Sequence, residues 1–315
     1  RVPTPMIEVR HVCKAFKQFR AVWDLSFNIA PGDIFGFVGP NGAGKTTTMR
    51  MMATLLDPDY GDIVIDGVSV LDEPEMIRRV IGYMPDYIGV YEGVEIEEYL
   101  DFFAAAYRIP PARRKTLCNE IMEITELTDV RHKDVATLSK GMRQRLCLAK
   151  TLVHDPKVLI LDEPAAGLDP RARIELRLLL KELQKLGKTI IISSHILTEL
   201  SDMCNSVGII ERGLLLKAGR IDEILAEQRG AAGQKLRIRV MGSPDPAVAV
   251  LKTLPDIGGV EIERDNITFT FLQPEASNPG LMRELLARGV PLVSIAQESR
   301  NLEDIFLNVT KGVIA

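Results

Sequence analysis

The hydrophobic pattern of the chain changes along its length. Apolar and polar residues alternate in residues 7–29 and 63–71. Alternation with a period of two is typical of strands with one buried face, so these segments predict a small antiparallel sheet. Elsewhere, short runs are apolar throughout, as expected for strands that a parallel sheet buries on both faces. These runs are 34–38, 158–161, 189–193 and 207–210, and they predict an α/β core.

A long insertion separates the first two of these buried strands. Residues from about 94 to 155 are mostly helical in pattern, and they include an aromatic and acidic stretch from Glu95 to Tyr107. We expect this insertion to form a helical subdomain. The α/β core, the antiparallel subdomain and the helical subdomain together make one predicted domain, residues 1–226.

A second domain is predicted after a linker at 227–234, where charge, Gly and Ala occur without a periodic apolar face. From 235 to 315 the pattern predicts strand, helix, two strands, helix and strand, followed by a final helix at 302–309. That order matches a ferredoxin-like sandwich, so we expect a small C-terminal α+β domain. Nothing catalytic is visible in it.

Composition and charge limit the classes of function. No apolar run approaches the roughly 18 to 20 residues that a spanning helix needs, and no signal segment is visible, so we expect a cytoplasmic protein. The formal net charge is −4 and the pI about 5.7, so no nucleic-acid partner is expected. The four cysteines contain no CxxC pair that would indicate a metal or redox site.

A phosphate-binding loop follows the first buried strand and precedes an apolar helical stretch. Its residues are Gly39, Pro40, Asn41, Gly42, Ala43, Gly44, Lys45 and Thr46, with Thr47 next to them. Glycines let consecutive N–H groups turn toward phosphate oxygens, and the helix N-terminus adds a positive dipole. Lys45 is predicted to reach the β- and γ-phosphates, and Thr46 to hold Mg²⁺. The alternative is a Gly-rich turn with a chance lysine.

Two carboxylates end the next buried strand. Val158–Leu161 is followed by Asp162 and Glu163, the form expected of a Walker-B segment. Asp162 is predicted to take the metal, and Glu163 to polarise the attacking water or accept its proton. Without the phosphate loop, such a pair would more often be a solvated turn.

Further motifs make the resemblance specific. Leu138-Ser139-Lys140-Gly141-Met142 opens an apolar helix and resembles the signature motif of ABC ATPases. Asp169 resembles the family's D-loop aspartate, and His195 resembles its switch-loop histidine. The resemblance covers residues 7 to about 225 and implies a P-loop NTPase, RecA-like core. N-capping alone would explain Ser139, and a cap is compatible with a contact to phosphate. His195 by itself would be an ordinary structural histidine, but beside the other motifs it indicates a γ-phosphate contact.

A few residues differ from the family's usual pattern or allow a second interpretation. Phe16 lies where the family places an aromatic ring that stacks on adenine, although it could belong to the core. Lys140 and Met142 stand where the family usually has Gly and Gln, which puts any ribose contact from Met142 in doubt. Asp86 replaces a Gln that normally senses Mg²⁺ and the lytic water. It would bind the metal more strongly but lose an amide donor, and a structural role is the alternative.

The resemblance implies ATP and Mg²⁺ as cofactors and in-line attack of water on the γ-phosphate. It implies that Ser139 and Gly141 face the γ-phosphate of a second copy in a head-to-tail dimer, and that Asp169 is a nucleotide-binding residue. It also implies separate transmembrane permease subunits, with this chain peripheral on the inner face of the cell membrane. The single cassette, the signature and the stretch Leu302–Leu307 look like the ABC-2 export group.

Two other classes of function are alternatives to a transporter ATPase. A soluble ABC ATPase acting on nucleic acid or ribosomes would usually carry a long coiled coil or two cassettes, and the sequence shows neither. A metabolic P-loop kinase or GTPase would leave the signature motif and His195 unexplained.

Overall fold

The computed structural model describes residues 4–86, 89, 92–196, 200, 203–225, 233–263 and 266–297. The chain divides into two compact units, the first reaching Ile221 and the second beginning at Asp222. Residues 227–232 of the predicted linker and the predicted final helix at 302–309 lie outside the described residues. Each unit is described by itself.

An antiparallel sheet forms the first layer of unit 1. Its strand order is β2-β1-β4-β5. The strands are β1 (Ile7–Phe16), β2 (Phe19–Ile29), β4 (Tyr60–Ile65) and β5 (Val68–Ser69). Burial alternates at Ile7 and Val9 of β1 and from Leu25 to Ile29 of β2, because one face of this sheet is covered. Register shifts interrupt the alternation elsewhere in this pair of strands. The alternation in the sequence therefore predicted this sheet correctly.

A six-stranded sheet forms the second layer, with the order β10-β9-β3-β8-β7-β6. The strands are β3 (Ile34–Val38), β6 (Ile81–Met84), β7 (Val158–Leu161), β8 (Thr189–Ser194), β9 (Ser206–Glu211) and β10 (Leu214–Arg220). Neighbouring strands are parallel except for β10, which pairs antiparallel with β9. All four buried runs of the sequence lie in this sheet, and every residue of β3, β7 and β8 is buried.

Strand β6 is not predicted by the sequence pattern. The segment is only four residues long and contains Gly82 and Tyr83, so its apolar signal is weak. Gly82 is required by packing, because a Cβ there would lie 2.6 Å from Cγ2 of Thr151. Long-range packing therefore made this segment a strand.

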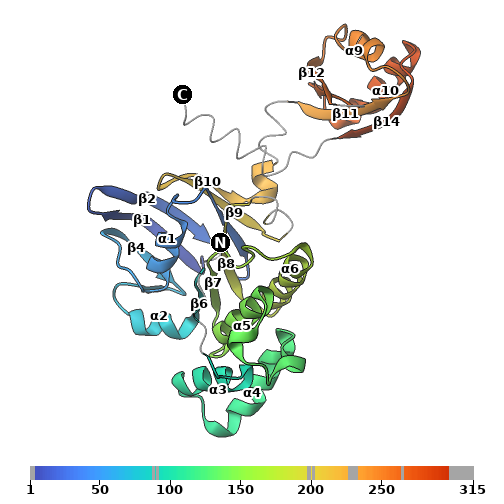
Figure 1. The fold of residues 1–315 in the computed structure, drawn as a ribbon. Helices are drawn as coiled ribbons and strands as arrows, with labels where there is room; N and C mark the ends of the chain where they lie inside the picture. The colour runs from blue at the N-terminus through green and yellow to red at the C-terminus, as the bar shows by residue number, and fades with distance from the viewer. Residues whose placement is uncertain are drawn as a thin grey trace. The chain divides into compact units, whose positions relative to one another are not determined.

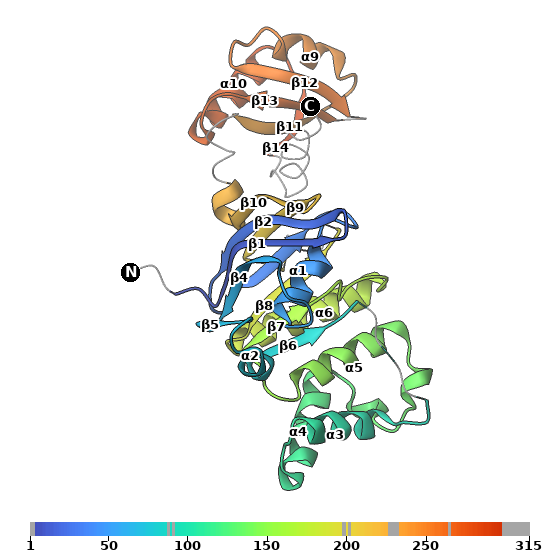
Figure 2. The ribbon, with the colours of Figure 1, turned by 90° about the vertical axis from the view of Figure 1, so that its left-hand side faces the viewer.

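One hydrophobic core joins the two sheets. Helix α1 (Lys45–Met52) contributes Met49, Met51 and Met52 to it. The ring of Phe27 in β2 stacks on that of Phe35 in β3, with 5.1 Å between the ring centroids. Helix α2 (Pro74–Val80) adds Ile77 to the same core. This packing holds α1 and the phosphate loop between the two sheets (Figures 1 and 2).

The insertion is helical, and Figure 1 shows its helices gathered at one end of the unit. They are α3 (Ile96–Ala106), α4 (Pro111–Ile124) and α5 (Lys140–Leu152), with 3-10 turns η1 (Thr128–Val130) and η2 (Val135–Thr137) between α4 and α5. They enclose their own core around Leu100, Met122 and Leu146. Helix α6 (Pro170–Lys185) follows β7 and buries Leu176, Leu180 and Leu183.

Unit 2 contains a four-stranded antiparallel sheet with the order β12-β13-β11-β14. Its elements are β11 (Gln234–Val240), α9 (Asp245–Leu251), β12 (Ile257–Glu263), β13 (Asn266–Phe271), η3 (Glu275–Ser277), α10 (Asn278–Ala287) and β14 (Leu292–Gln297). Leu251 of α9 and Leu285 of α10 pack on Ile238 and Phe269 of the sheet. Within the described ranges, no helix is long and apolar enough to cross a lipid bilayer.

Candidate active site

The phosphate loop connects β3 to α1, and its backbone conformation requires glycine. Gly44 has φ of 108°, a conformation that side chains disfavour. At Gly39 a Cβ would lie 2.1 Å from the carbonyl oxygen of Ile210, so the strand and the loop touch backbone to backbone. Nζ of Lys45 donates hydrogen bonds to the carbonyl oxygens of Gly39 at 2.6 Å and Pro40 at 3.2 Å. The loop thus wraps around the ammonium group.

Lys45 is buried, and its charge has one close carboxylate partner. Nζ lies 3.6 Å from Oε1 of Glu163. Burial lowers the pKa of Lys45, while the charges of Glu163 and Asp162 oppose that change. The pair therefore links the phosphate loop to the end of β7.

Asp162 is completely buried at the end of β7. Its Oδ1 accepts a hydrogen bond of 2.6 Å from the Ser193 hydroxyl, while Oδ2 has no hydrogen-bond partner among the described residues. Burial raises the pKa of Asp162, the hydroxyls of Ser193 and Thr46 oppose this, and the charges of Asp86 and Glu163 add to it. A buried carboxylate with one free oxygen is suited to a cation.

Glu163 lies between two of the other predicted residues. Its φ of 48° turns the chain directly after β7. Its backbone N–H donates to the Ser193 hydroxyl at 2.8 Å, and Oε2 lies 2.9 Å from Nδ1 of His195. The structure thus brings together Lys45, Asp162, Glu163 and His195, which the sequence places in three separate segments.

Ser193 was missed by the sequence analysis as a site residue. Its hydroxyl donates to Asp162 and accepts from the amide of Glu163, so one side chain holds both acidic residues. The available signal was a serine at the end of a fully buried strand, where a hydroxyl needs a partner.

The predicted signature and D-loop residues lie at two helix starts. Ser139 caps α5 by accepting a hydrogen bond from the amide of Met142, and Asp169 caps α6 by accepting one from the amide of Ala172. The two helix starts are close, because a Cβ on Gly141 would lie 3.8 Å from the Cβ of Ala172. In the described part of the chain, no hydrogen bond or ion pair joins Ser139, Gly141 or Asp169 to the phosphate loop.

The remaining predicted residues are more open. The Phe16 ring is 46% exposed at the end of β1, so it is not a core residue. Asp86 is exposed two residues after β6, and its charge acts on Asp162. Thr46 and Thr47 are half-buried at the start of α1.

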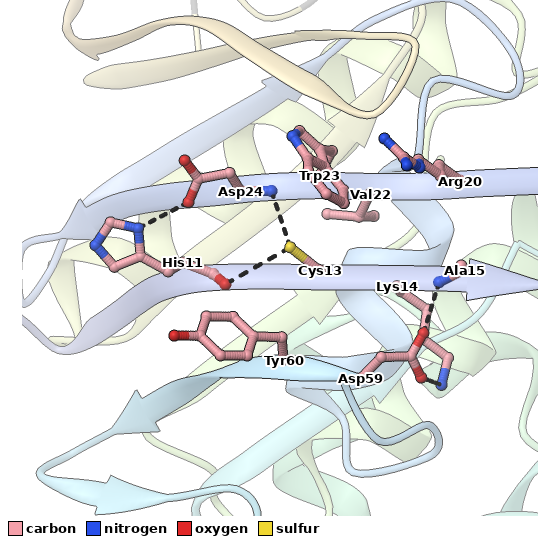
Figure 3. A pocket seen from close by; sticks show the side chains of 10 residues that line it. All are labelled: His11, Cys13, Lys14, Ala15, Arg20, Val22, Trp23, Asp24, Asp59 and Tyr60. Carbon is pink, nitrogen blue, oxygen red and sulfur yellow. Dashed lines mark hydrogen bonds and ion pairs between the residues drawn. The ribbon is translucent and has the colours of Figure 1, made fainter.

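A pocket of about 670 Å³ lies elsewhere, over β1, β2 and the start of β4 (Figure 3). It contains none of the predicted phosphate-binding residues. Its polar groups contact one another: His11 is 2.7 Å from Asp24, and Lys14 is 2.7 Å from Asp59. These paired side chains show no sign of a missing ligand.

Comparison with known proteins identifies the family. The model of the family described as "ABC transporter" matches residues 22–166. An uncharacterized ABC transporter ATP-binding protein, YhcH of Bacillus subtilis (strain 168), is 36% identical over 310 residues, which are 97% of this chain and 96% of the relative. The chain belongs to the ATP-binding subunits of ABC transporters.

Two further likenesses agree with this family. Nod factor export ATP-binding protein I of Rhizobium meliloti (strain 1021) is 33% identical over 308 residues, covering 98% of this chain and 89% of the relative. A solved ATP-binding subunit of an ABC transporter is 30% identical with a TM-score of 0.64, and the match covers 71% of this chain and 93% of that one. The ABC ATPase described here binds and hydrolyses ATP.

Proposed function

We propose that this ABC ATPase powers export of a substrate through separate transmembrane permease subunits. It would work in the cytoplasm, peripheral on the inner face of the cell membrane. The Rhizobium meliloti relative, named for Nod factor export, supports export, and its alignment covers 98% of this chain. The motifs that resemble the ABC-2 group point to the same class.

The observation that carries the hydrolytic mechanism is the position of Glu163 between Lys45 and His195. Lys45 would exchange its bonds to the loop carbonyls for bonds to the β- and γ-phosphates of ATP. Glu163 would polarise the attacking water or take its proton, and His195 would contact the γ-phosphate. The exposed Phe16 ring would stack on adenine.

The site fits Mg²⁺ because one buried carboxylate oxygen is available to bind a cation. The buried Oδ2 of Asp162 has no partner in the described structure, and the Thr46 hydroxyl is close enough to lower the pKa of that carboxyl in part. We assign Mg²⁺ to Thr46, Asp162 and Asp86. No group of three His, Cys, Asp or Glu side chains in the described part of the chain could hold a metal by itself. Nucleotide phosphates and water would supply the remaining ligands, and bound Mg²⁺ would neutralise phosphate charge.

A second copy completes the proposed site. Ser139, Gly141 and Asp169 make no hydrogen bond to the phosphate loop of their own chain in the described structure, yet they lie at helix N-termini suited to anions. In a head-to-tail dimer they would face the γ-phosphate held by the partner's loop. Each of two sites would then be shared between two chains.

We assign residues 1–226 to the ATPase domain, 227–234 to the linker and 235–315 to an accessory domain. In the accessory domain the strands are arranged in the order β14-β11-β13-β12. Helix α9 connects β11 to β12, and helix α10 lies between β13 and β14. This arrangement supports a ferredoxin-like topology.

Co-expression with a neighbouring gene tests the function. A reading frame beside this gene that encodes about six apolar spans should produce a membrane protein that copurifies with the tagged ATPase. The complex should hydrolyse ATP, and the complex made with Glu163→Gln should form but not turn over. Copurification with ribosomes or nucleic acid in place of the membrane protein would contradict the proposal and favour a soluble ABC ATPase.

A further inference from the structure

Two buried polar atoms on neighbouring strands have no hydrogen-bond partner among the described residues. One is Oδ2 of Asp162, just after β7, and the other is the hydroxyl oxygen of Tyr83 in β6. Buried hydroxyls and carboxylates are costly unless a partner satisfies them. Two orphaned groups in one region therefore require an explanation.

Strand pairing places the two residues at the same end of the sheet. Tyr83 is paired with Ile160 and Met84 with Leu161 in the parallel register of β6 and β7. The amide of Asp162 then donates to the carbonyl oxygen of Met84 at 2.9 Å. Asp162 thus lies two residues after Ile160, the residue paired with Tyr83, toward the carboxyl ends of the strands.

The negative charge of the Asp162 carboxylate acts on the Tyr83 hydroxyl. Burial raises the pKa of Tyr83, and the negative charge of Asp162 is the next largest cause in the same direction. Arg50 opposes these effects as a nearby side-chain hydrogen-bond donor toward the phenol oxygen and through its charge, and Asp86 adds a smaller effect that raises the pKa. A donor on the oxygen leaves the phenol's own proton free to be donated. The phenol therefore keeps its proton and remains a hydrogen-bond donor, but it makes no direct bond to Asp162.

A single buried water can satisfy both groups. Such waters typically make two to four hydrogen bonds to buried polar atoms. We propose that Tyr83 is a positioning residue, whose hydroxyl donates to a buried water that in turn donates to Oδ2 of Asp162. The bridge orients the carboxylate toward the cation. This inference rests on the proposed role of Asp162 at the Mg²⁺ site.

A purely structural Tyr83 has a different signature. If the hydroxyl were only an unsatisfied group in the core, its removal would leave stability unchanged or raise it, and nothing at the metal would change. As a partner one water away from a metal ligand, it sets the orientation of that ligand. Loss of such outer partners typically lowers metal affinity or activity about 10- to 100-fold.

The test is Tyr83→Phe, which removes one oxygen atom and retains the ring. The melting temperature of the full chain is measured without nucleotide, and then with a non-hydrolysable ATP analogue over a titration of Mg²⁺. We expect no loss of stability without nucleotide, and a half-saturating Mg²⁺ concentration raised by about tenfold. The kcat for ATP should fall, while nucleotide affinity without Mg²⁺ should not change.

Tyr107→Phe is the matched control. Burial raises the pKa of Tyr107 as well, but no carboxylate acts on it, and its ring stacks on His154 with 4.0 Å between centroids. This variant should titrate with Mg²⁺ as the wild type does.

If Tyr83→Phe and the wild type have the same half-saturating Mg²⁺ concentration, the inference about Tyr83 is wrong. A wild-type response to Mg²⁺ in the same experiment would still support the proposed metal site. A melting temperature lowered equally at every Mg²⁺ concentration would also overturn it, because that result describes packing alone. A wild-type protein with no response to Mg²⁺ would overturn the metal site itself, and the inference with it.

Discussion

The backbone of Glu163 is held in an unfavourable conformation where its side chain is needed. A positive φ of 48° in a residue other than glycine costs on the order of 1–3 kcal/mol. The surroundings impose this conformation through the Ser193 hydroxyl, which accepts from the Glu163 amide, and through contacts of the carboxylate with Lys45 and His195. Strain of this kind is common at catalytic positions, where geometry matters more than local stability.

Replacing that carboxylate tests its role in turnover. Glu163→Gln keeps the side-chain size but removes the charge that polarises water, so kcat should fall at least about 100-fold. ATP affinity should change little, because Lys45 and the loop amides supply most of the ground-state binding. The variant should accumulate as an ATP-bound dimer, visible by size-exclusion chromatography or light scattering.

Glu182→Gln is a suitable control, because this residue is exposed on α6 and pairs only with Lys185 in the described structure. It should retain wild-type activity. Near wild-type turnover in Glu163→Gln would remove Glu163 from the mechanism.

At the scale of elements, one contact ties the start of α5 to the loop before α6. A Cβ on Gly167, whose φ is 67°, would lie 2.1 Å from Nζ of Lys140. Lys140 is the first residue of α5, where the family usually has glycine, and its stem crosses the D-loop backbone. A Cβ at Gly167 would therefore displace the ammonium end of Lys140, which is the far end of a flexible side chain and can move aside.

This contact predicts a partly compensating pair. Gly167→Ala should lower the melting temperature mainly because it strains φ, and to a smaller extent because it displaces the flexible end of Lys140. Combining it with Lys140→Gly should restore the part lost through the displacement and leave the φ strain of about 1 kcal/mol.

Gly187→Ala is the reference for strain alone, since Gly187 has φ of 86° and would gain no contact within 4 Å. Its effect should be the same in the presence and absence of Lys140. If Lys140→Gly changed the melting temperatures of Gly167→Ala and Gly187→Ala by the same amount, the contact between Lys140 and Gly167 would be contradicted.

At the scale of the whole molecule, the proposed sites cannot form within one chain. In the proposal, the phosphate loop, Asp162, Glu163 and His195 would make one half of a site. The signature and D-loop residues would make the other half of a different site. A head-to-tail dimer is therefore the smallest complete enzyme in this proposal.

Mixing inactive variants tests this arrangement. Lys45→Ala and Ser139→Arg should each be inactive, and their mixture should regain part of the activity, because each heterodimer contains one intact shared site. ATPase activity is measured over a range of mixing ratios.

A mixture of Lys45→Ala with Glu163→Gln is the control. Both changes lie in the same half, so each heterodimer has two damaged sites and no recovery is expected. Recovery in neither mixture would argue for sites contained within single chains or for an enzyme that needs both sites intact.

Local sequence determined the elements that have a strong pattern of their own. The phosphate loop, the runs that became β3, β7, β8 and β9, and the alternating strands of the antiparallel sheet were all predictable. Each depends on neighbouring residues: period two for a half-buried strand, a continuous apolar run for a buried one, and glycines where φ must be positive. The motifs also indicated the family, because their order along the chain is itself part of the sequence.

Tertiary structure alone decided which groups meet. Ser193 reaches Asp162 from a strand 31 residues away, and His195 reaches Glu163 across 32 residues. The four residues of β6 became a strand only because β7 pairs with them, and that pairing also brought Tyr83 near Asp162. Such contacts depend on strand order and on burial, which change hydrogen bonding and pKa values without leaving a periodic signal in the chain. The sequence by itself therefore determined the chemical groups of the site, and the folding of distant segments onto one sheet decided how those groups are paired.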